Sequence, residues 1–275
     1  MTVDELLVYG KQYIHKDLSK LLLSDMINKN ALELLNYLDL EVNNEISEKY
    51  KRAVEAIRNN KPIQYVLNKV NFYGLELYVD ERCLIPRFET EELVEKTLEV
   101  INNNFDKVSI VDLGCGSGAI GLTIKNKLPS SEVDLIDISE DALEVSKINK
   151  DKHKLDVAII HNDMLKNINK KYDVIISNPP YIKENEEIED IVKNNEPHNA
   201  LYAGLDGLKF YEEILEDIKD NIKEKYLITF EIGSDQKEDL EVLATKYLPD
   251  SKYKCYKDMQ GRDRIFLIAS KDVNI

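Results

Sequence analysis

The sequence predicts an α/β fold in which helices cover both faces of a mainly parallel sheet, with a small helical bundle in front of it. Beyond residue 105, short apolar runs of strand length alternate with segments of helical periodicity, a pattern typical of parallel sheets. Within residues 1–60, leucine and isoleucine recur at helical spacing, with one glycine and no proline. Charge also differs along the chain: residues 1–75 hold ten acidic and ten basic side chains, so the net charge of -15 arises wholly in residues 76–275.

A change of apolar period near residue 71 divides the chain. Up to residue 70, the helical spacing predicts a domain of short helices. We expect this domain to serve in packing and in presenting a binding partner, and we expect no catalytic residues in it. From Asn71 the spacing approaches strand alternation and Gly74 can form a turn, so we expect a β-hairpin linker over residues 71–88. Residues 89–275 form the predicted α/β domain.

The α/β domain is expected to begin with a helix from about Glu91, after Pro86 has interrupted regular structure, and Glu89 or Thr90 could cap this helix. The predicted strands cover residues 108–113, 133–138, 157–160, 174–177, 226–231, 252–256 and 264–269. The other predicted helices cover residues 119–128, 141–152, 208–222 and 236–247. Ser139 is a natural N-cap for the helix at 141, and the turn at 260–263 predicts that the last two strands form a hairpin at one sheet edge.

Composition and charge exclude several classes of protein. With 43% apolar and 32% charged side chains in 275 residues, the chain can bury a substantial core. The first residues include acids and no long apolar run, and no segment reaches the roughly 18 apolar residues of a membrane span. We therefore expect a soluble, cytoplasmic protein. We also expect it to be a monomer. The strongly acidic balance opposes direct binding to nucleic-acid phosphates.

Cysteine and histidine give no sign of a metal site or a disulfide framework. Cys83, Cys115 and Cys255 lie far apart and form no C-x-x-C pair, and the four histidines are equally scattered. We expect no bound metal.

Three glycines at alternate positions, Gly114, Gly116 and Gly118, follow a predicted strand and precede a predicted helix. Glycine permits a tight turn and a close approach of ligand to backbone, and the amides at the helix start attract a polar or anionic group. Asp137 ends the next strand, where a carboxylate can accept hydrogen bonds from both hydroxyls of a ribose. The expected ligand is therefore a cofactor that contains adenosine.

The glycine loop by itself does not separate two such cofactors. Read from Gly116, it also satisfies the dinucleotide pattern G-x-G-x-x-G through Gly121. Asp112, beside the loop, would oppose a pyrophosphate and suits a ligand that carries an ammonium group, which favours S-adenosylmethionine. Asp163 and Met164, after the following strand, could meet the amino group and ring face of adenine, although a surface aspartate beside a core methionine explains this pair equally well.

The motif Asn178-Pro179-Pro180-Tyr181 directly follows a predicted central strand, at the end where open α/β folds bind ligands. The prolines remove two N–H donors, so the local backbone offers carbonyl groups. The side-chain oxygen of Asn178 and the carbonyl of Pro179 can both accept hydrogen bonds from one NH2 group, and Tyr181 can stack on its plane. This arrangement would orient a planar amide or aromatic amine toward a methyl sulfonium.

The same motif resembles the signature of methyltransferases that modify planar NH2 groups. The chain as a whole resembles the HemK/PrmC family of peptide chain release factor glutamine methyltransferases. The segments that carry this resemblance follow in order through residues 62–65, 84–87, 89–91, 114–118, 178–182, 196–197, 200–201, 204–208, 231–233, 236 and 261–264. Two residues depart from the family pattern, both near the linker: Asn68 stands where glycine is usual, and Phe88 where proline is usual.

The resemblance implies a class I S-adenosylmethionine-dependent methyltransferase domain, Rossmann-like, with seven strands of which the last is antiparallel. It also implies an N-terminal substrate-recognition domain. The product of the cofactor would be S-adenosylhomocysteine. The residues that the resemblance assigns to the cofactor are Gly114, Cys115, Gly116, Ser117, Gly118, Asp137, Met164 and Asn178. Those that it assigns to the substrate are Asn178, Pro179, Pro180 and Tyr181, with Asn178, Pro179 and Tyr181 as catalytic residues.

The implied reaction is methylation of the side-chain nitrogen (N5) of the glutamine in the Gly-Gly-Gln motif of bacterial-type release factors, which act in translation termination. A glutamine in a ribosomal protein is an alternative that the sequence separates poorly. A protein that binds the cofactor without turnover is disfavoured by the intact motif. Adenine N6-methylation of DNA would need a basic face. Acidic side chains instead follow the motif, at Glu184, Glu186, Glu187, Glu189 and Asp190.

Overall fold

The structure, a computed structural model, describes residues 1–275 and divides them into two compact units. The first unit contains Met1–Lys69 and also Glu189–Asn195, and the second contains Val70–Ile188 and Glu196–Ile275. The short segment Glu189–Asn195 lies within residues 89–275, which the sequence assigns entirely to the α/β domain. In the first unit, Asn195 donates a hydrogen bond through Nδ2 to the carbonyl of Asn60 at 2.9 Å.

The first unit is a bundle of short helices around an apolar core. Its helices are α1 (Val3–Gly10), α2 (Lys16–Met26), the 3-10 helix η1 (Leu34–Tyr37), α3 (Asn44–Arg58), α4 (Ile63–Leu67) and α8 (Asp190–Lys193). Thr2 caps α1 in a reciprocal capping box with Glu5, and Asn43 accepts from the amide of Ile46 at the start of α3. The hydroxyl groups of Tyr50 and Ser19 are hydrogen-bonded at 2.7 Å inside the bundle. The bundle thus has its own core and its own caps.

The second unit is built on a seven-stranded sheet in the order β5-β4-β3-β6-β7-β9-β8. Its strands are β3 (Ser109–Leu113), β4 (Glu132–Asp137), β5 (Ala158–His161), β6 (Tyr172–Ser177), β7 (Ile222–Glu231), β8 (Lys252–Lys257) and β9 (Asp263–Ala269). The strands β3 to β7 run parallel, and β9 runs antiparallel to both β7 and β8. The predicted sheet and its terminal hairpin are confirmed. From β3 the chain adds β4 and β5 on one side, and it then adds β6 and β7 on the other side. The position between β3 and β6 is therefore the topological switch point of the sheet.

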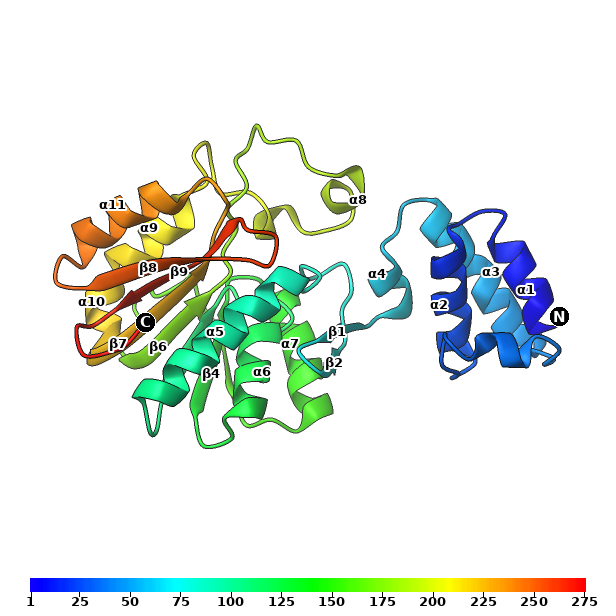
Figure 1. The fold of residues 1–275 in the computed structure, drawn as a ribbon, viewed down its shortest axis with the longest axis horizontal. Coiled ribbons are helices and arrows are strands. Elements are labelled where there is room, and N and C mark those ends of the chain that lie inside the picture. Colours follow the sequence, from blue (N-terminus) through cyan, green and yellow to red (C-terminus); the bar gives the residue numbers. More distant parts are fainter. The chain divides into compact units, whose positions relative to one another are not determined.

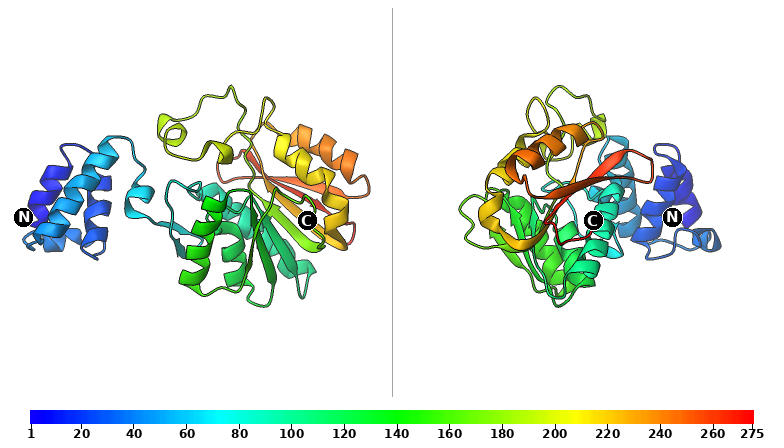
Figure 2. Two further views of the ribbon diagram at one scale, coloured as in Figure 1. Left: turned by 180° about the vertical axis from the view of Figure 1, so that it is seen from behind. Right: turned by 60° about the vertical axis from the view of Figure 1, so that its left-hand side comes forward.

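Helices cover both faces of this sheet, as the alternating sequence pattern predicts. They are α5 (Phe88–Asn104), α6 (Ala119–Lys127), α7 (Glu140–His153), α9 (Lys209–Glu216), α10 (Ile218–Asn221) and α11 (Lys237–Tyr247). The 3-10 helix η2 (His198–Ala200) lies in the connection between α8 and α9. The helices α5, α6 and α7 share one apolar core with the sheet, and α9, α10 and α11 share another on its opposite face (Figures 1 and 2). None of the helices in the chain is both long and apolar enough to cross a membrane.

The predicted hairpin is present as β1 (Val70–Phe72) and β2 (Leu75–Leu77), which pair antiparallel in a separate small sheet. The two departures from the family pattern lie on either side of it. Asn68 ends α4 in the left-handed region at φ +52°, a conformation that glycine adopts most easily and asparagine tolerates. Phe88 is the first residue of α5, the position that favours proline, and its side chain is exposed. Local backbone geometry accommodates both residues.

Several of the predicted element boundaries are wrong. The helix α5 begins at Phe88 and has no side-chain cap, so neither Glu89 nor Thr90 caps it; Thr90 is buried inside its first turn. The helix expected over residues 208–222 is divided into α9 and α10, and β7 begins already at Ile222. The spacing of Ile218 and Ile222 is helical, but Ile222 pairs with the sheet opposite Tyr172 of β6. Tertiary pairing therefore decides this boundary.

Gly121, in the first turn of α6, lets this helix approach β3 and β4 closely. A Cβ atom at this position would overlap with Leu135 Cδ2 and would stand 3.1 Å from Asp112 Oδ2. We predict that Gly121→Ala lowers the free energy of unfolding by about 1–3 kcal/mol, because the overpacked interface has to open. Urea unfolding of the purified protein measures this change.

Asn126→Ala provides the control, because Asn126 lies on the exposed side of the same helix. Its expected effect is within about 0.5 kcal/mol of zero. Equal stability of the Gly121→Ala variant and the wild type would show that the close helix approach carries no cost.

Candidate active site

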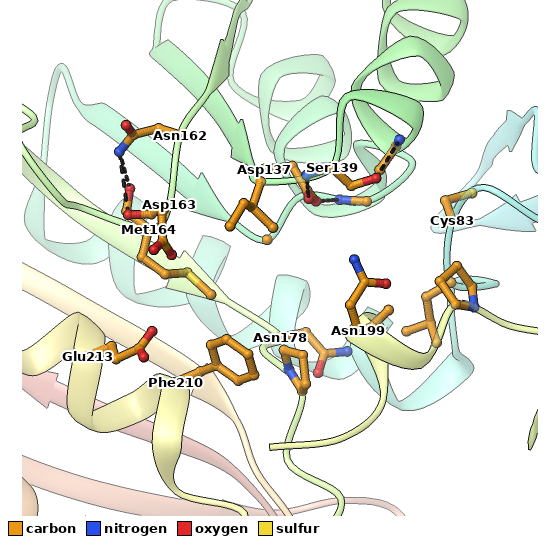
Figure 3. A pocket seen from close by; sticks show the side chains of 18 of the residues that line it. Cys83, Asp137, Ser139, Asn162, Asp163, Met164, Asn178, Asn199, Phe210 and Glu213 are labelled. Carbon is orange, nitrogen blue, oxygen red and sulfur yellow. Dashed lines mark hydrogen bonds between the residues drawn. The ribbon is translucent and has the colours of Figure 1, made fainter. Parts of the chain in front are cut away.

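A cavity of about 530 Å³ opens at the carboxyl ends of the central strands, beside the switch point of the sheet. Six of the predicted site residues line it: Gly114, Gly116, Asp137, Met164, Asn178 and Pro180. Figure 3 shows Asp137 and Asn178 on opposite sides of this cavity. The other predicted site residues, which are Cys115, Ser117, Gly118, Pro179 and Tyr181, are not among the residues that line it.

The glycine loop presents bare backbone to the cavity. Gly114, Gly116 and Gly118 all have positive φ, at +68°, +56° and +79°. A Cβ atom on Gly114 or Gly116 would meet nothing within 4 Å, whereas one on Gly118 would stand 2.9 Å from Leu122 in α6. Gly114 and Gly116 thus leave room on the cavity side, and Gly118 is needed for the packing of the helix start.

Two side chains of α7 form hydrogen bonds with the backbone of the glycine loop. Ser146 Oγ donates to the carbonyl of Gly116 at 2.7 Å, and Asn149 Nδ2 donates to the carbonyl of Ser117 at 2.9 Å. Cys115 and Ser117 are themselves buried. The two residues therefore take part in the loop through its backbone, and their side chains belong to the core.

Asp137 is tied to the glycine loop by its carboxylate. Its Oδ2 accepts from the amide of Gly116 at 2.8 Å, and its Oδ1 accepts from the amide of Ser139 at 2.9 Å. Ser139 also caps α7, as predicted. Burial raises the pKa of Asp137, and the amide hydrogens of Ser139 and Gly116 oppose this rise. Each carboxylate oxygen keeps a further lone pair for a ligand hydroxyl.

Asn162, Asp163 and Met164 follow β5 and line the same cavity. Asn162 Nδ2 donates to the carbonyl of Met164 at 2.9 Å, and it stabilises the turn in which Met164 adopts φ +47°. Asp163 forms an ion pair with Lys166 at 2.6 Å. All of these residues border the cavity, and Met164 also packs against the apolar core on that side of the sheet. A contact of Asp163 and Met164 with adenine stays a prediction.

Asp112 lies beneath the loop and does not line the cavity. Its carboxylate is fully buried: Oδ2 accepts from the amide of Gly121 at 2.9 Å, while Oδ1 has no hydrogen-bond partner. Asp112 therefore does not face the cavity, where the sequence predicts that it meets the ammonium group of a ligand. The observed contact stabilises the start of α6.

The Asn178-Pro179-Pro180-Tyr181 motif contributes Asn178 and Pro180 to the cavity, but Tyr181 turns away from it. The hydroxyl of Tyr181 donates to Glu231 Oε1 at 3.3 Å and accepts from Arg264 Nη1 at 3.4 Å. Tyr181 is therefore not among the residues that line the cavity, and the stacking of its ring on a substrate stays a prediction. The buried Glu231 gives this hydroxyl an acceptor, and Arg264 gives it a donor.

Asn178 uses only one side of its amide within the protein. Its Nδ2 donates to the hydroxyl of Thr90 at 3.1 Å, and this hydroxyl donates in turn to Glu231 Oε2 at 2.6 Å. In Figure 3, Asn178 lies between the side chains of Phe210 and Asn199. The side-chain oxygen of Asn178 has no protein partner and is the acceptor that the motif offers to a ligand.

Sequence reasoning missed Phe210, Glu213 and Asn199, which also line the cavity. Phe210 and Glu213 come from α9, and Asn199 comes from η2. The only available signal was their closeness to the motif segments at residues 200–201 and 204–208. That signal is weak, because one helical turn does not reveal which face of a helix looks into a cavity.

Other segments of the family pattern brace the site. Gln236 Nε2 donates to the carbonyls of Gly207 at 3.0 Å and Tyr181 at 3.3 Å, and its Oε1 accepts from the amide of Gly233 at 2.8 Å. Glu196, whose side chain is buried, accepts from Arg87 at 2.6 Å. These buried polar groups join loops that lie far apart in the sequence.

Residues 92–196 match the family described as the methyltransferase small domain, and residues 15–67 match the PrmC N-terminal domain. The release factor glutamine methyltransferase of Streptococcus pneumoniae is 37% identical over 244 residues, which cover 88% of this chain and 87% of the relative. That of Bacillus subtilis is 36% identical over 276 residues, 96% of each chain. The chain belongs to the release factor glutamine methyltransferase family. Its resemblance to this family, first seen in the motifs, is thereby confirmed.

The fold of the family is that of class I methyltransferases. A crystal structure of a methyltransferase from Pyrococcus furiosus superimposes with a TM-score of 0.52 at 17% identity, and the match covers 80% of this chain and 98% of the other. At this identity the likeness concerns the fold alone. No group of three or more His, Cys, Asp and Glu side chains is arranged to hold a metal ion.

The buried carboxyl group of Asp112 should make stability depend on pH. Burial raises the pKa of Asp112 to about 7, the charge of Asp137 adds to this rise, and the amide of Gly121 opposes it. The folded state therefore binds this proton more tightly than the unfolded state, and stability is lost as the pH rises toward 7. Relative to Asp112→Asn, we predict that the wild type loses about 1–3 kcal/mol between pH 5 and pH 8.

Urea unfolding of both ligand-free proteins across this pH range measures the difference. Glu231 titrates in both proteins, so its contribution cancels in the comparison. Parallel stability curves for the wild type and the variant would contradict the prediction.

Proposed function

We propose that this protein transfers a methyl group from S-adenosylmethionine to the side-chain nitrogen (N5) of the glutamine in the Gly-Gly-Gln motif of peptide chain release factors. The main observation behind the proposal is how the side-chain amide of Asn178 is hydrogen-bonded. Its Nδ2 donates to the hydroxyl of Thr90, and its oxygen is left as an acceptor for a ligand. Asp137 and the glycine loop border the same cavity as Asn178. Relatives that bear the name release factor glutamine methyltransferase support the choice of substrate.

The residues at one side of the cavity fit S-adenosylmethionine. Gly114 and Gly116 leave open space where side chains would otherwise stand, and Asp137 keeps free lone pairs on both carboxylate oxygens. In this proposal, Asp137 accepts from the ribose hydroxyls, and Met164 and Phe210 border the adenine. When bound, the cofactor supplies an electrophilic methyl group on a sulfonium, so no metal or redox group is required.

Residues at the other side make a poor nucleophile usable. The lone pair of an amide nitrogen is delocalised into the carbonyl group, so the amide has to be held in one plane and aimed. The proposal assigns this task to the side-chain oxygen of Asn178 and the carbonyl of Pro179, which accept the two hydrogens of the substrate NH2 group. Once the nitrogen carries a methyl group, its surplus proton is acidic and leaves to water. Catalysis then rests mainly on orientation.

The proposed partner is a protein rather than a nucleic acid, and the proposed enzyme works as a monomer in the cytoplasm. The net charge of -15 supports a protein partner, because such a charge repels a phosphate backbone.

The decisive experiment incubates the protein with S-adenosylmethionine carrying a labelled methyl group. Purified release factors, release factors with the Gly-Gly-Gln glutamine replaced by alanine, unmodified ribosomes and duplex DNA serve as parallel substrates. We expect label only in the unaltered release factors. Label in ribosomes or DNA alone would overturn the proposed substrate.

Asn178→Ala should abolish transfer while cofactor binding is retained. Removal of one preorganised hydrogen-bonding group at a reacting centre costs about 100- to 1,000-fold in kcat. The Kd for the cofactor, measured by calorimetry, should change by no more than about 3-fold. A change of this size is less than the loss of one neutral hydrogen bond to the cofactor would cause. Asn103→Ala, on the exposed side of α5, serves as the control. Retained turnover in Asn178→Ala would remove Asn178 from the mechanism.

Asp137→Ala should weaken cofactor binding, because two hydrogen bonds to a charged acceptor are lost. We predict an increase in Kd of at least about 10-fold, measured by calorimetry without any release factor present. Asp151→Ala, an exposed aspartate of α7, is the matched control and should leave Kd unchanged. Undiminished affinity in Asp137→Ala would refute the assignment of Asp137 to the cofactor.

A further inference from the structure

A buried polar chain leads away from the cavity behind Asn178. It passes from Asn178 to Thr90, in the first turn of α5, and on to Glu231 at the end of β7, with N···O and O···O distances of 3.1 and 2.6 Å. Thr90 and Glu231 are only 4% and 2% exposed, and neither lines the cavity. The mechanism above therefore gives these two residues no role in contact with a substrate.

The direction of these hydrogen bonds follows from elementary chemistry. An ionised carboxylate can only accept hydrogen bonds, and a threonine hydroxyl has a single hydrogen to donate. Once that hydrogen is given to Glu231, the hydroxyl of Thr90 can only accept from its other neighbour. The amide of Asn178 must then turn its NH2 group toward Thr90, which leaves its oxygen on the opposite side.

We propose that Thr90 and Glu231 are positioning residues that hold the side-chain oxygen of Asn178 toward the NH2 group of the substrate. The inference rests on the proposed function, because it concerns the same amide substrate. An asparagine amide has nearly the same shape after a 180° flip, so its shape alone does not select an orientation. The flipped form would set one NH2 group against another, with no acceptor for the substrate.

Glu231 is itself held in place on its other side. Its Oε1 accepts from the hydroxyl of Tyr181, which accepts from Arg264. Arg264 also donates to the carbonyl of Ile232 at 3.0 Å and pairs with Asp258 at 3.3 Å. Burial raises the pKa of Glu231, while the hydroxyl of Thr90 and the charge of Arg264 lower it. Each oxygen of this buried carboxyl group thus accepts a hydrogen bond, Oε2 from Thr90 and Oε1 from Tyr181.

Thr90 could also serve only to join α5 to β7, and Thr97 in the same helix provides the comparison for such a purely structural role. Thr97 lies two turns further along α5 and is also buried, with its hydroxyl 3.1 Å from that of Thr229 in β7 and 2.7 Å from the carbonyl of Leu93. This contact joins the same two elements away from the cavity. Thr97→Val is therefore a matched control for Thr90→Val.

Steady-state kinetics with a release factor tests the proposal. Thr90→Val should lower kcat by at least about 10-fold, while the KM for the release factor and the Kd for the cofactor change by no more than about 3-fold. Thr90→Ser restores the hydroxyl and should recover most of the activity. Thr97→Val should keep the wild-type kcat, even where it lowers the unfolding temperature as much as Thr90→Val does. Unchanged kcat in Thr90→Val, or an equal loss of kcat in Thr97→Val, would overturn the proposal.

Glu231→Gln tests the direction of the chain. A glutamine can donate to Thr90 as well as accept from it, so both orientations of Asn178 become accessible and kcat should fall. Because the two residues act in one chain, the double variant with Thr90→Val should be no slower than Thr90→Val alone. Multiplicative losses would contradict the shared role.

A measurement without turnover separates this inference from the proposed function. The side-chain NH2 signals of Asn178 in a 15N-labelled protein are identified by their loss in Asn178→Ala. Their hydrogen exchange with solvent should be slow in the wild type and Thr90→Ser, and faster in Thr90→Val. Equal exchange rates would overturn the inference even where methyl transfer is seen. A wild type that fails to methylate release factors but shows the expected exchange pattern would overturn the proposed function alone.

Discussion

The register of the parallel strands is the constraint on which the site depends. Across the centre of the sheet one row of residues is aligned, namely Ile136, Leu113, Ser177 and Phe230 from β4 to β7. The residues that follow this row are Asp137, Gly114, Asn178 and Glu231. A carboxylate, a glycine backbone, an amide and a buried acid therefore lie side by side at the carboxyl ends of the strands, although Gly114 and Glu231 are 117 positions apart in the chain. A shift of one strand by one residue would turn its side chains to the other face and disperse this group.

The sheet is buried on both faces, so polar groups at its edge have to find partners among the neighbouring loops. Gln236 meets this need by hydrogen bonds to three loops, and Glu196 by its bonds to Arg87 and the amide of Ile85. The same requirement ties Asp137 to the glycine loop and Thr90 to Glu231. In such a site, hydrogen bonds within the protein already fix the polar side chains in position, which suits a reaction that depends on orientation.

Local sequence signals predicted elements well and their ends less well. The glycine loop, the Ser139 cap and the terminal hairpin depend on neighbouring residues, and the structure contains all three. The predicted cap of α5 by Thr90 was wrong because the partner of its hydroxyl, Glu231, lies 141 positions away. The long helix predicted at 208–222 was wrong because pairing with β6 draws Ile222 into a strand.

The sequence alone determined the order of the elements, the class of the fold and the family. It also determined the cavity residues that follow directly after strands. Each of these features depends on a pattern of residues that are close together in the sequence. Tertiary structure alone decided where side chains point. It turned Tyr181 toward Glu231 and Arg264, brought Phe210 to the cavity and joined Glu189–Asn195 to the first unit. The physical reason is that a buried donor or acceptor forms a hydrogen bond with whichever group lies next to it in the folded chain. Neither the periodicity of the sequence nor the spacing of its motifs shows which group that is.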